Sequence, residues 1–245
     1  MNRLLITAAL AAVLAAGCQS SGPIGPDRVA EIVASPDRSA ADRTNDRRRK
    51  PELLLGFIGV RPGMTALDVS AGGGYTTELL ARAVGPAGKV YAHSANPNSA
   101  TRIAERKKNP ALANIVTVTR PLDNPIPPEA AGSLDLVTFM FNYHDLGHMG
   151  VNRAALNRAV FDALKPGGLY VVADHSGRPG TGISESNTVH RIEEEFLRKE
   201  VEAAGFRLAE TGNFLRNPND PRDRETPQPP MPKDEFVLKF FKPRS

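Results

Sequence analysis

The sequence has a single cysteine, Cys18, among its 245 residues. A chain with one thiol cannot form an internal disulfide, so packing and hydrogen bonding must hold the fold together. The chain also lacks a strong charge of either sign, because 31 basic residues are interspersed with 27 acidic ones. This balance gives little support to a nucleic-acid-binding protein. The one basic run, Arg47 to Lys50, is expected to be a solvated helix start just before Pro51.

The apolar run at residues 4–16 is too short to cross a bilayer as a helix. It follows a positive charge and leads into small residues, which is typical of a secretory signal. Residues 14–17, Leu-Ala-Ala-Gly, resemble the lipobox of bacterial lipoproteins, which implies cleavage before Cys18 and lipid attachment to its thiol. We therefore expect a signal peptide at 1–17, a lipidated tether at 18–26 and an exported protein anchored in the bacterial cell envelope, facing the periplasm. An ordinary cleaved signal with a chance cysteine is the alternative.

Short apolar runs alternate with helical segments along residues 27–245, the expected folded domain. The apolar runs predict strands at 65–69, 89–92, 115–119, 134–141 and 169–173. The other segments predict helices at 52–58, 76–84, 99–107, 152–164 and 188–204. Two extended segments, 206–215 and 236–240, then follow each other without a helix between them. The sequence predicts an α/β fold with a doubly wound, mostly parallel seven-stranded sheet and a C-terminal antiparallel hairpin.

A glycine-rich turn follows the first predicted strand. From Asp68 to Gly74 it reads Asp-Val-Ser-Ala-Gly-Gly-Gly. Glycines let the backbone approach a ligand closely, and the free N–H groups of the next helix favour a carboxylate or phosphate. A strand, a glycine-rich turn and a helix in this order are the context that a nucleotide site requires.

This turn resembles motif I of the class I S-adenosylmethionine-dependent methyltransferases. Residues 134–137 are similar to the fourth strand of that family, residues 164–169 to the turn before its fifth strand, and the terminal hairpin to its reversed seventh strand. The chain looks most like an exported group of predicted methyltransferases that carry Tyr-His-Asp after strand four and Asp-His-Ser after strand five. The resemblance implies a Rossmann-like methyltransferase fold and S-adenosylmethionine as the cofactor.

The resemblance also implies roles for the turn. Asp68 is expected to contact the amino group of the methionine moiety, directly or through water. The backbones of Gly72 and Gly74 are expected to pass beneath the cofactor. Ser70 stands where the first glycine of the motif is usual, and a negative φ would accommodate it.

The family's ribose-binding carboxylate is missing from this chain. After the second predicted strand the sequence is His-Ser-Ala-Asn, so Ser94 or Asn96 is expected to hydrogen-bond the ribose, less strongly than an ionised acceptor would. Asp123 is the only acid near the expected adenine contacts at 121–124. The predicted cofactor-binding residues are therefore Asp68, Ser70, Gly72, Gly74, Ser94 and Asp123.

Two His/Asp pairs follow neighbouring predicted strands. Tyr143, His144 and Asp145 come after the fourth strand, and Asp174 and His175 after the fifth. Because ligands bind at the carboxyl ends of a doubly wound sheet, we expect the pairs to meet there. His144 and His175 are the candidate general bases, with Asp145 and Asp174 to orient them. Tyr143 is expected to position the substrate or contact the sulfonium. Alternatively, either pair caps a strand end or helix start.

His148, four residues after His144, raises the question of a metal. Gly147 and Gly150 disfavour a rigid helix there and no compact ligand motif is present, so we expect none. The leading interpretation is an enzyme that transfers a methyl group from S-adenosylmethionine to a small molecule. A non-catalytic exported binding module and a metal-dependent enzyme at the His/Asp edge are the alternatives. Export conflicts with the ordinary supply of this cofactor.

Overall fold

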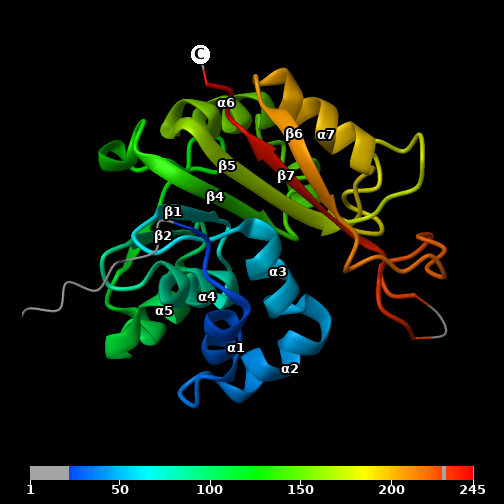
Figure 1. Ribbon diagram of the computed structural model, residues 1–245. Coiled ribbons are helices and arrows are strands. Elements are labelled where there is room, and N and C mark those ends of the chain that lie inside the picture. Colours follow the sequence, from blue (N-terminus) through cyan, green and yellow to red (C-terminus); the bar gives the residue numbers. More distant parts are fainter. Residues whose placement is uncertain (1–21, 228–229, 245) are drawn as a thin grey trace, which may run out of the picture.

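The computed structural model describes residues 22–227 and 230–244, and its centre is a seven-stranded sheet of order β3-β2-β1-β4-β5-β7-β6 (Figure 1). The strands are β1 (Thr65–Val69), β2 (Lys89–His93), β3 (Ile115–Val118), β4 (Leu134–Met140), β5 (Leu164–His175), β6 (Arg207–Gly212) and β7 (Glu235–Phe241). Strands β1 to β5 pair in parallel, and β7 runs antiparallel to both of its neighbours. The predicted doubly wound sheet with a C-terminal antiparallel hairpin is confirmed.

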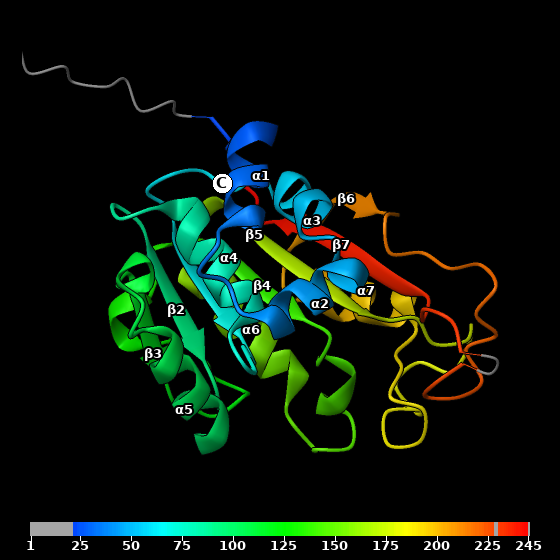
Figure 2. The ribbon, with the colours of Figure 1, turned by 90° about the horizontal axis from the view of Figure 1, so that it is seen from below.

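Helices cover both faces of the sheet (Figure 1). They are α1 (Pro26–Ala34), α2 (Ala40–Arg49), α3 (Pro51–Ile58), α4 (Tyr75–Val84), α5 (Pro97–Arg106), α6 (Arg153–Ala163) and α7 (Glu194–Ala203). Figure 2 views the face that α1 to α5 cover, while α6 and α7 pack in the core on the opposite face. Ser39, Asn96 and Asn152 cap α2, α5 and α6 by accepting a backbone N–H.

The amino-terminal part of the fold differs from the prediction. Ile24 donates its N–H to the Val60 carbonyl and Pro26 opens α1, so the end of the expected tether belongs to the folded domain. The basic run ends α2 rather than starting a helix, and Lys50, with a left-handed φ of 44°, separates α2 from α3. The predicted signal peptide and Cys18 lie outside the described residues. Among those that are described, no helix combines the length and hydrophobicity needed to cross a membrane.

Helix α7 begins at Glu194 instead of residue 188. Ile192 pairs with the end of β5, since its N–H bonds the His175 carbonyl and its carbonyl accepts the N–H of Gly177. Those bonds hold Ile192 beside the end of β5, and a helix that began at residue 188 would break them.

The segment between β6 and β7 packs on the domain through a buried charge pair. Arg191 is fully buried, and its guanidinium lies 2.9 Å from Asp220 and donates to the Ser176 carbonyl. In Figures 1 and 2 this orange-red segment lies beside the yellow loop that precedes α7. One buried cation therefore joins the two longest loops at the carboxyl end of β5.

We predict that Arg191→Met lowers the free energy of unfolding by about 3–5 kcal/mol, because it leaves the Asp220 carboxylate buried without its cation. Arg158→Met is the control: it removes an exposed pair with Asp162 and should cost less than about 1 kcal/mol. Urea unfolding of both variants measures the difference. Equal losses would contradict this account of the loop.

Candidate functional site

Two adjoining cavities, of about 210 and 330 Å³, lie at the carboxyl ends of β1, β2 and β4. Ser70, Gly72 and Asn142 line both, so we treat the pair as one groove and call it the Gly72 groove. Asp68 lies at the end formed by the smaller cavity, and Ser94 at the end formed by the larger one. The groove is therefore at the sheet edge where doubly wound folds bind ligands.

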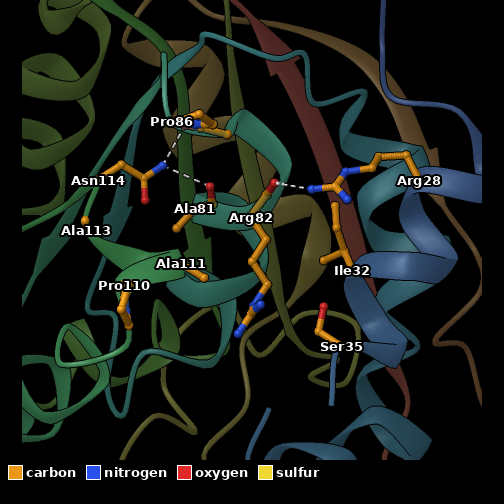
Figure 3. A pocket seen from close by; sticks show the side chains of 11 residues that line it. Arg28, Ile32, Ser35, Ala81, Arg82, Pro86, Pro110, Ala111, Ala113 and Asn114 are labelled. Atoms are coloured by element: carbon orange, nitrogen blue, oxygen red, sulfur yellow. Dashed lines mark hydrogen bonds between the residues drawn. The ribbon is translucent and has the colours of Figure 1, made fainter. Parts of the chain in front are cut away.

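A cavity of about 500 Å³ lies elsewhere, between α1 and α4 (Figure 3). Three of its side chains have protein partners: Arg28 donates to the Arg82 carbonyl, Asn114 donates to the carbonyls of Ala81 and Gly85, and Arg82 pairs with Glu78 and Asp37. It contains none of the candidate site residues. We therefore regard this cavity as a gap in the packing between helices and not as a ligand site, although it is larger than either cavity of the Gly72 groove.

Ser70 adopts a φ of 53°, so the expected negative φ is wrong. Its N–H donates to Nδ1 of His93, 3.2 Å away, while Nε2 of the same ring lies 2.9 Å from the Arg120 carbonyl. These two partners fix a neutral ring that donates from Nε2 and accepts at Nδ1. Burial lowers the pKa of His93, which agrees with a neutral ring. The sequence analysis did not identify His93, because the expected ribose contacts at this strand end were Ser94 and Asn96.

Asp68 is 1% exposed beneath the groove. Its two oxygens accept hydrogen bonds from Thr77, at 2.7 Å, and from Thr138, at 2.8 Å. Burial raises the pKa of Asp68 to about 6, and those hydroxyls and the charge of Arg49 limit the rise. The carboxylate is thus held in a fixed orientation at one end of the groove.

The three glycines of the turn have different surroundings. Gly72, at a φ of 57°, has open space where a Cβ would be, with only the Ser70 carbonyl at 4.0 Å. A Cβ on Gly74 would lie 2.9 Å from Arg106, whose side chain covers that part of the turn and bonds the Gly73 carbonyl. The prediction that Gly74 passes beneath a ligand is wrong, whereas Gly72 does line the groove.

The expected ribose and adenine contacts are only partly in place. The Ser94 hydroxyl bonds the backbone of Asn96, and the Asn96 side chain caps α5, so local structure engages both. Asp123 is exposed and is not among the lining residues, where Leu122 stands instead. The contact between Asp123 and adenine therefore stays a prediction.

Arg49 is a groove residue that the sequence analysis missed. It comes from the last turn of α2, lines the groove beside Asp68, and stacks 3.8 Å from the centre of the Phe141 ring. Burial lowers its pKa to about 10, so it stays a cation at neutral pH. The strongly polar sequence of α2 gave no apolar periodicity from which to predict the helix.

The His/Asp pairs meet as expected, but with different partners. Asp174 holds His144, accepting from its backbone N–H at 2.7 Å and lying 2.6 Å from Nδ1. Asp145 lies 3.1 Å from the other ring nitrogen, Nε2. Burial opposes the charge on His144, but these two carboxylates outweigh it and raise its pKa to about 9.

His175 pairs with Glu235 rather than with Asp174. Its Nδ1 lies 2.9 Å from a Glu235 oxygen, close enough for an ion pair though poorly aligned for a hydrogen bond. Burial lowers the pKa of His175, and the neighbouring carboxylates reduce but do not cancel that effect. The rings of His144 and His175 lie 5.4 Å apart, so the edge holds one imidazole of raised and one of lowered pKa.

Tyr143 points away from this edge. It is fully buried, and its hydroxyl accepts from Asn157 of α6 and donates to Glu200 of α7. The predicted contact with substrate or sulfonium is wrong. Phe141, with a left-handed φ of 63°, changes the direction of the chain after β4, and Asn142 faces the groove instead.

Comparison with known proteins agrees with this architecture. Residues 66–168 match the family described as methyltransferase domain. The ubiquinone/menaquinone biosynthesis C-methyltransferase UbiE of Burkholderia multivorans is 32% identical over 117 residues, which are 48% of this chain and 45% of that protein. UbiE of Cupriavidus taiwanensis is 30% identical over 124 residues, 51% of this chain and 48% of that protein. The chain spans about half the length of these curated relatives.

Solved structures are similar over more of the chain. An S-adenosylmethionine-dependent methyltransferase from Aquifex aeolicus has a TM-score of 0.62 at 18% identity, covering 89% of this chain and 98% of that one. The [4+2]-cyclase SpnF has the same TM-score and identity, covering 84% of this chain and 83% of its own. The fold is therefore the Rossmann-like methyltransferase fold, on which SpnF carries an activity named as a cyclase.

We predict that His93 makes stability depend on pH. Unfolded histidine binds a proton below about pH 6.5, whereas the buried ring, with its lowered pKa, stays neutral, so stability falls as pH drops below that value. His93→Gln removes this proton difference and should flatten the slope between about pH 5 and 6.5 by up to about 1.4 kcal/mol per pH unit. Urea unfolding across that range measures both slopes. Identical slopes would show that the ring is protonated in the folded protein.

Proposed function

We propose that the chain is a methyltransferase that binds S-adenosylmethionine in the Gly72 groove and methylates a small molecule. The observation that carries the proposal is the open backbone at Gly72, above the buried carboxylate of Asp68. The methyltransferase-domain match over residues 66–168 supports the same cofactor.

The two ends of the groove suit the two ends of this cofactor. At one end, the Asp68 carboxylate suits the methionine ammonium, and the Arg49 guanidinium suits the methionine carboxylate. At the other end, Leu122 offers an apolar contact for adenine. Neutral groups near Ser94 replace the usual ribose carboxylate, so we expect weaker binding than an ionised acceptor would give.

His175 is the general base in this proposal. A base must be unprotonated before reaction, and the lowered pKa of His175 meets that condition, whereas the raised pKa of His144 does not. His175 would take the acceptor's proton, and S-adenosylmethionine, when bound, would supply the methyl group to the acceptor atom and leave as a neutral thioether that retains the electron pair of the broken bond.

A basic cavity of about 430 Å³, which Glu235 separates from His175, is the proposed acceptor site. Its lining includes five cationic side chains and the carboxylate of Glu235, which also contacts His175: Arg47, Arg48, Lys50, Arg216 and Lys233. Arg48 packs over the Phe141 ring that Arg49 also contacts from the groove. This excess of positive charge favours an anionic small molecule.

Calorimetric titration with S-adenosylmethionine and S-adenosylhomocysteine tests the proposal. We expect saturable binding of both to the wild-type chain, and a loss of binding in Asp68→Ala. Absence of binding by both ligands would contradict the proposal and would favour the alternative, a non-catalytic module that binds another ligand.

A matched pair of glycine variants locates the ligand. Gly72 and Gly132 both have a positive φ, 57° and 65°, and no heavy atom nearer than 4.0 Å to an added Cβ, so alanine costs each a similar strain of about 1–2 kcal/mol. Only Gly72 lies in the groove. Gly72→Ala should therefore weaken binding at least about tenfold, while Gly132→Ala leaves it unchanged; equal affinities would place the ligand elsewhere.

The cellular location of the protein is also part of the proposal. Cys18 and the preceding signal-like segment support export and lipid anchoring at the cell envelope. Metabolic labelling with a fatty acid should mark the wild-type chain and not Cys18→Ser, which should leave the membrane fraction. Equal fractionation of both chains without label would contradict a lipid anchor.

A further inference from the structure

We propose that His144, Asp145 and His190 form a binding site for a divalent first-row transition metal, with Zn²⁺ the first candidate. A ring nitrogen from each histidine and a carboxylate oxygen of Asp145 lie within 4.8 Å of one another. Nε2 of His144 and Nδ1 of His190 are each 3.1 Å from the same Asp145 oxygen.

These separations fit ligands that share one ion. Zinc lies about 2.0–2.1 Å from imidazole nitrogen and carboxylate oxygen, and tetrahedral geometry then separates neighbouring ligand atoms by about 3.3 Å. The two observed separations of 3.1 Å are close to that value. The side chains would need only small adjustments to admit the ion.

Asp174 supports His144 in the way that carboxylates support metal-binding histidines. It lies 2.6 Å from Nδ1 and accepts the backbone N–H of the same residue. This arrangement fixes the orientation of the ring and directs Nε2 toward Asp145 and His190. A carboxylate behind the ring also raises the basicity of the ligating nitrogen.

His190 reaches the cluster from another part of the chain. It has a left-handed φ of 51° just before the residues that pair with the end of β5. Its Nδ1 is thereby brought to Asp145, 45 residues away in the sequence. His148 is nearby, but its Nδ1 lies 3.9 Å from Asp145 and pairs with Ser186, so we do not count it as a ligand.

The set of donor atoms indicates which ions the site would bind and what such an ion could do there. Two imidazoles and one carboxylate suit zinc, manganese or iron(II), and three protein ligands leave positions open for an exogenous one. Asp145 also lines the Gly72 groove. If the proposed methyl transfer holds, an ion here would lie at the wall of the cofactor groove; that role rests on the proposed function, but the ion site does not.

Zinc binding can be measured on the full chain without S-adenosylmethionine. After treatment with a chelator and its removal, calorimetric titration with Zn²⁺ should show one ion per chain, and elemental analysis of the dialysed protein should confirm the ratio. Asp145→Asn and His190→Gln should each weaken binding by more than about 100-fold. His175→Gln is the matched control, because its ring adjoins His144 but pairs with Glu235, and it should retain the affinity within about threefold.

Absence of stoichiometric binding to the wild-type chain would overturn the site, as would equal loss in the His175→Gln control. Thermal unfolding of each metal-free variant shows whether it is folded. If one of the two ligand variants does not fold, the other still tests the site. S-adenosylhomocysteine is titrated separately into metal-free protein. A failure of the cofactor proposal and a failure of the metal proposal therefore give different results.

Discussion

The hydrogen bond from the Ser70 amide to the His93 ring is the contact on which the candidate site depends. It ties the end of β1 to the end of β2, and the Ala71 amide adds a second tie to the His93 carbonyl. A serine held at a positive φ costs free energy, which the surrounding hydrogen bonds must offset. The consequence is a turn that keeps Gly72 open above Asp68. Without that turn the groove would lose its floor, while Thr77 and Thr138 would still hold the Asp68 carboxylate.

Strained backbone and buried charge gather at this one edge of the sheet. Ser70, Phe141 and His190 all have left-handed φ values, and each belongs to a segment that forms the edge. Such conformations persist only where the surrounding structure fixes them, and they cluster at functional sites. The edge holds two imidazoles in unlike environments, His144 between two carboxylates and His175 beside Glu235. The environment of His144 suits a protonated ring or a metal ion, and that of His175 suits a ring that removes a proton.

Local patterns in the sequence predicted the fold well, and the site less completely. Alternating apolar runs indicated the strands, and the glycine-rich turn indicated Asp68 and Gly72. The partners could not be predicted: Glu235 begins the last strand, 60 residues after His175, and only the sheet order brings them together. The prediction for Tyr143 was wrong because it rested on position after the fourth strand alone, and the left-handed Phe141 changes the direction of the chain there. Arg49 was missed because α2 has no apolar stripe.

A crystal structure of the full chain at saturating S-adenosylhomocysteine tests the central claim most directly. The account predicts electron density for the ligand against the backbone of Gly72, with its amino acid end between Asp68 and Arg49. Density elsewhere, or a groove closed by the Arg49 side chain at saturating ligand, would contradict it.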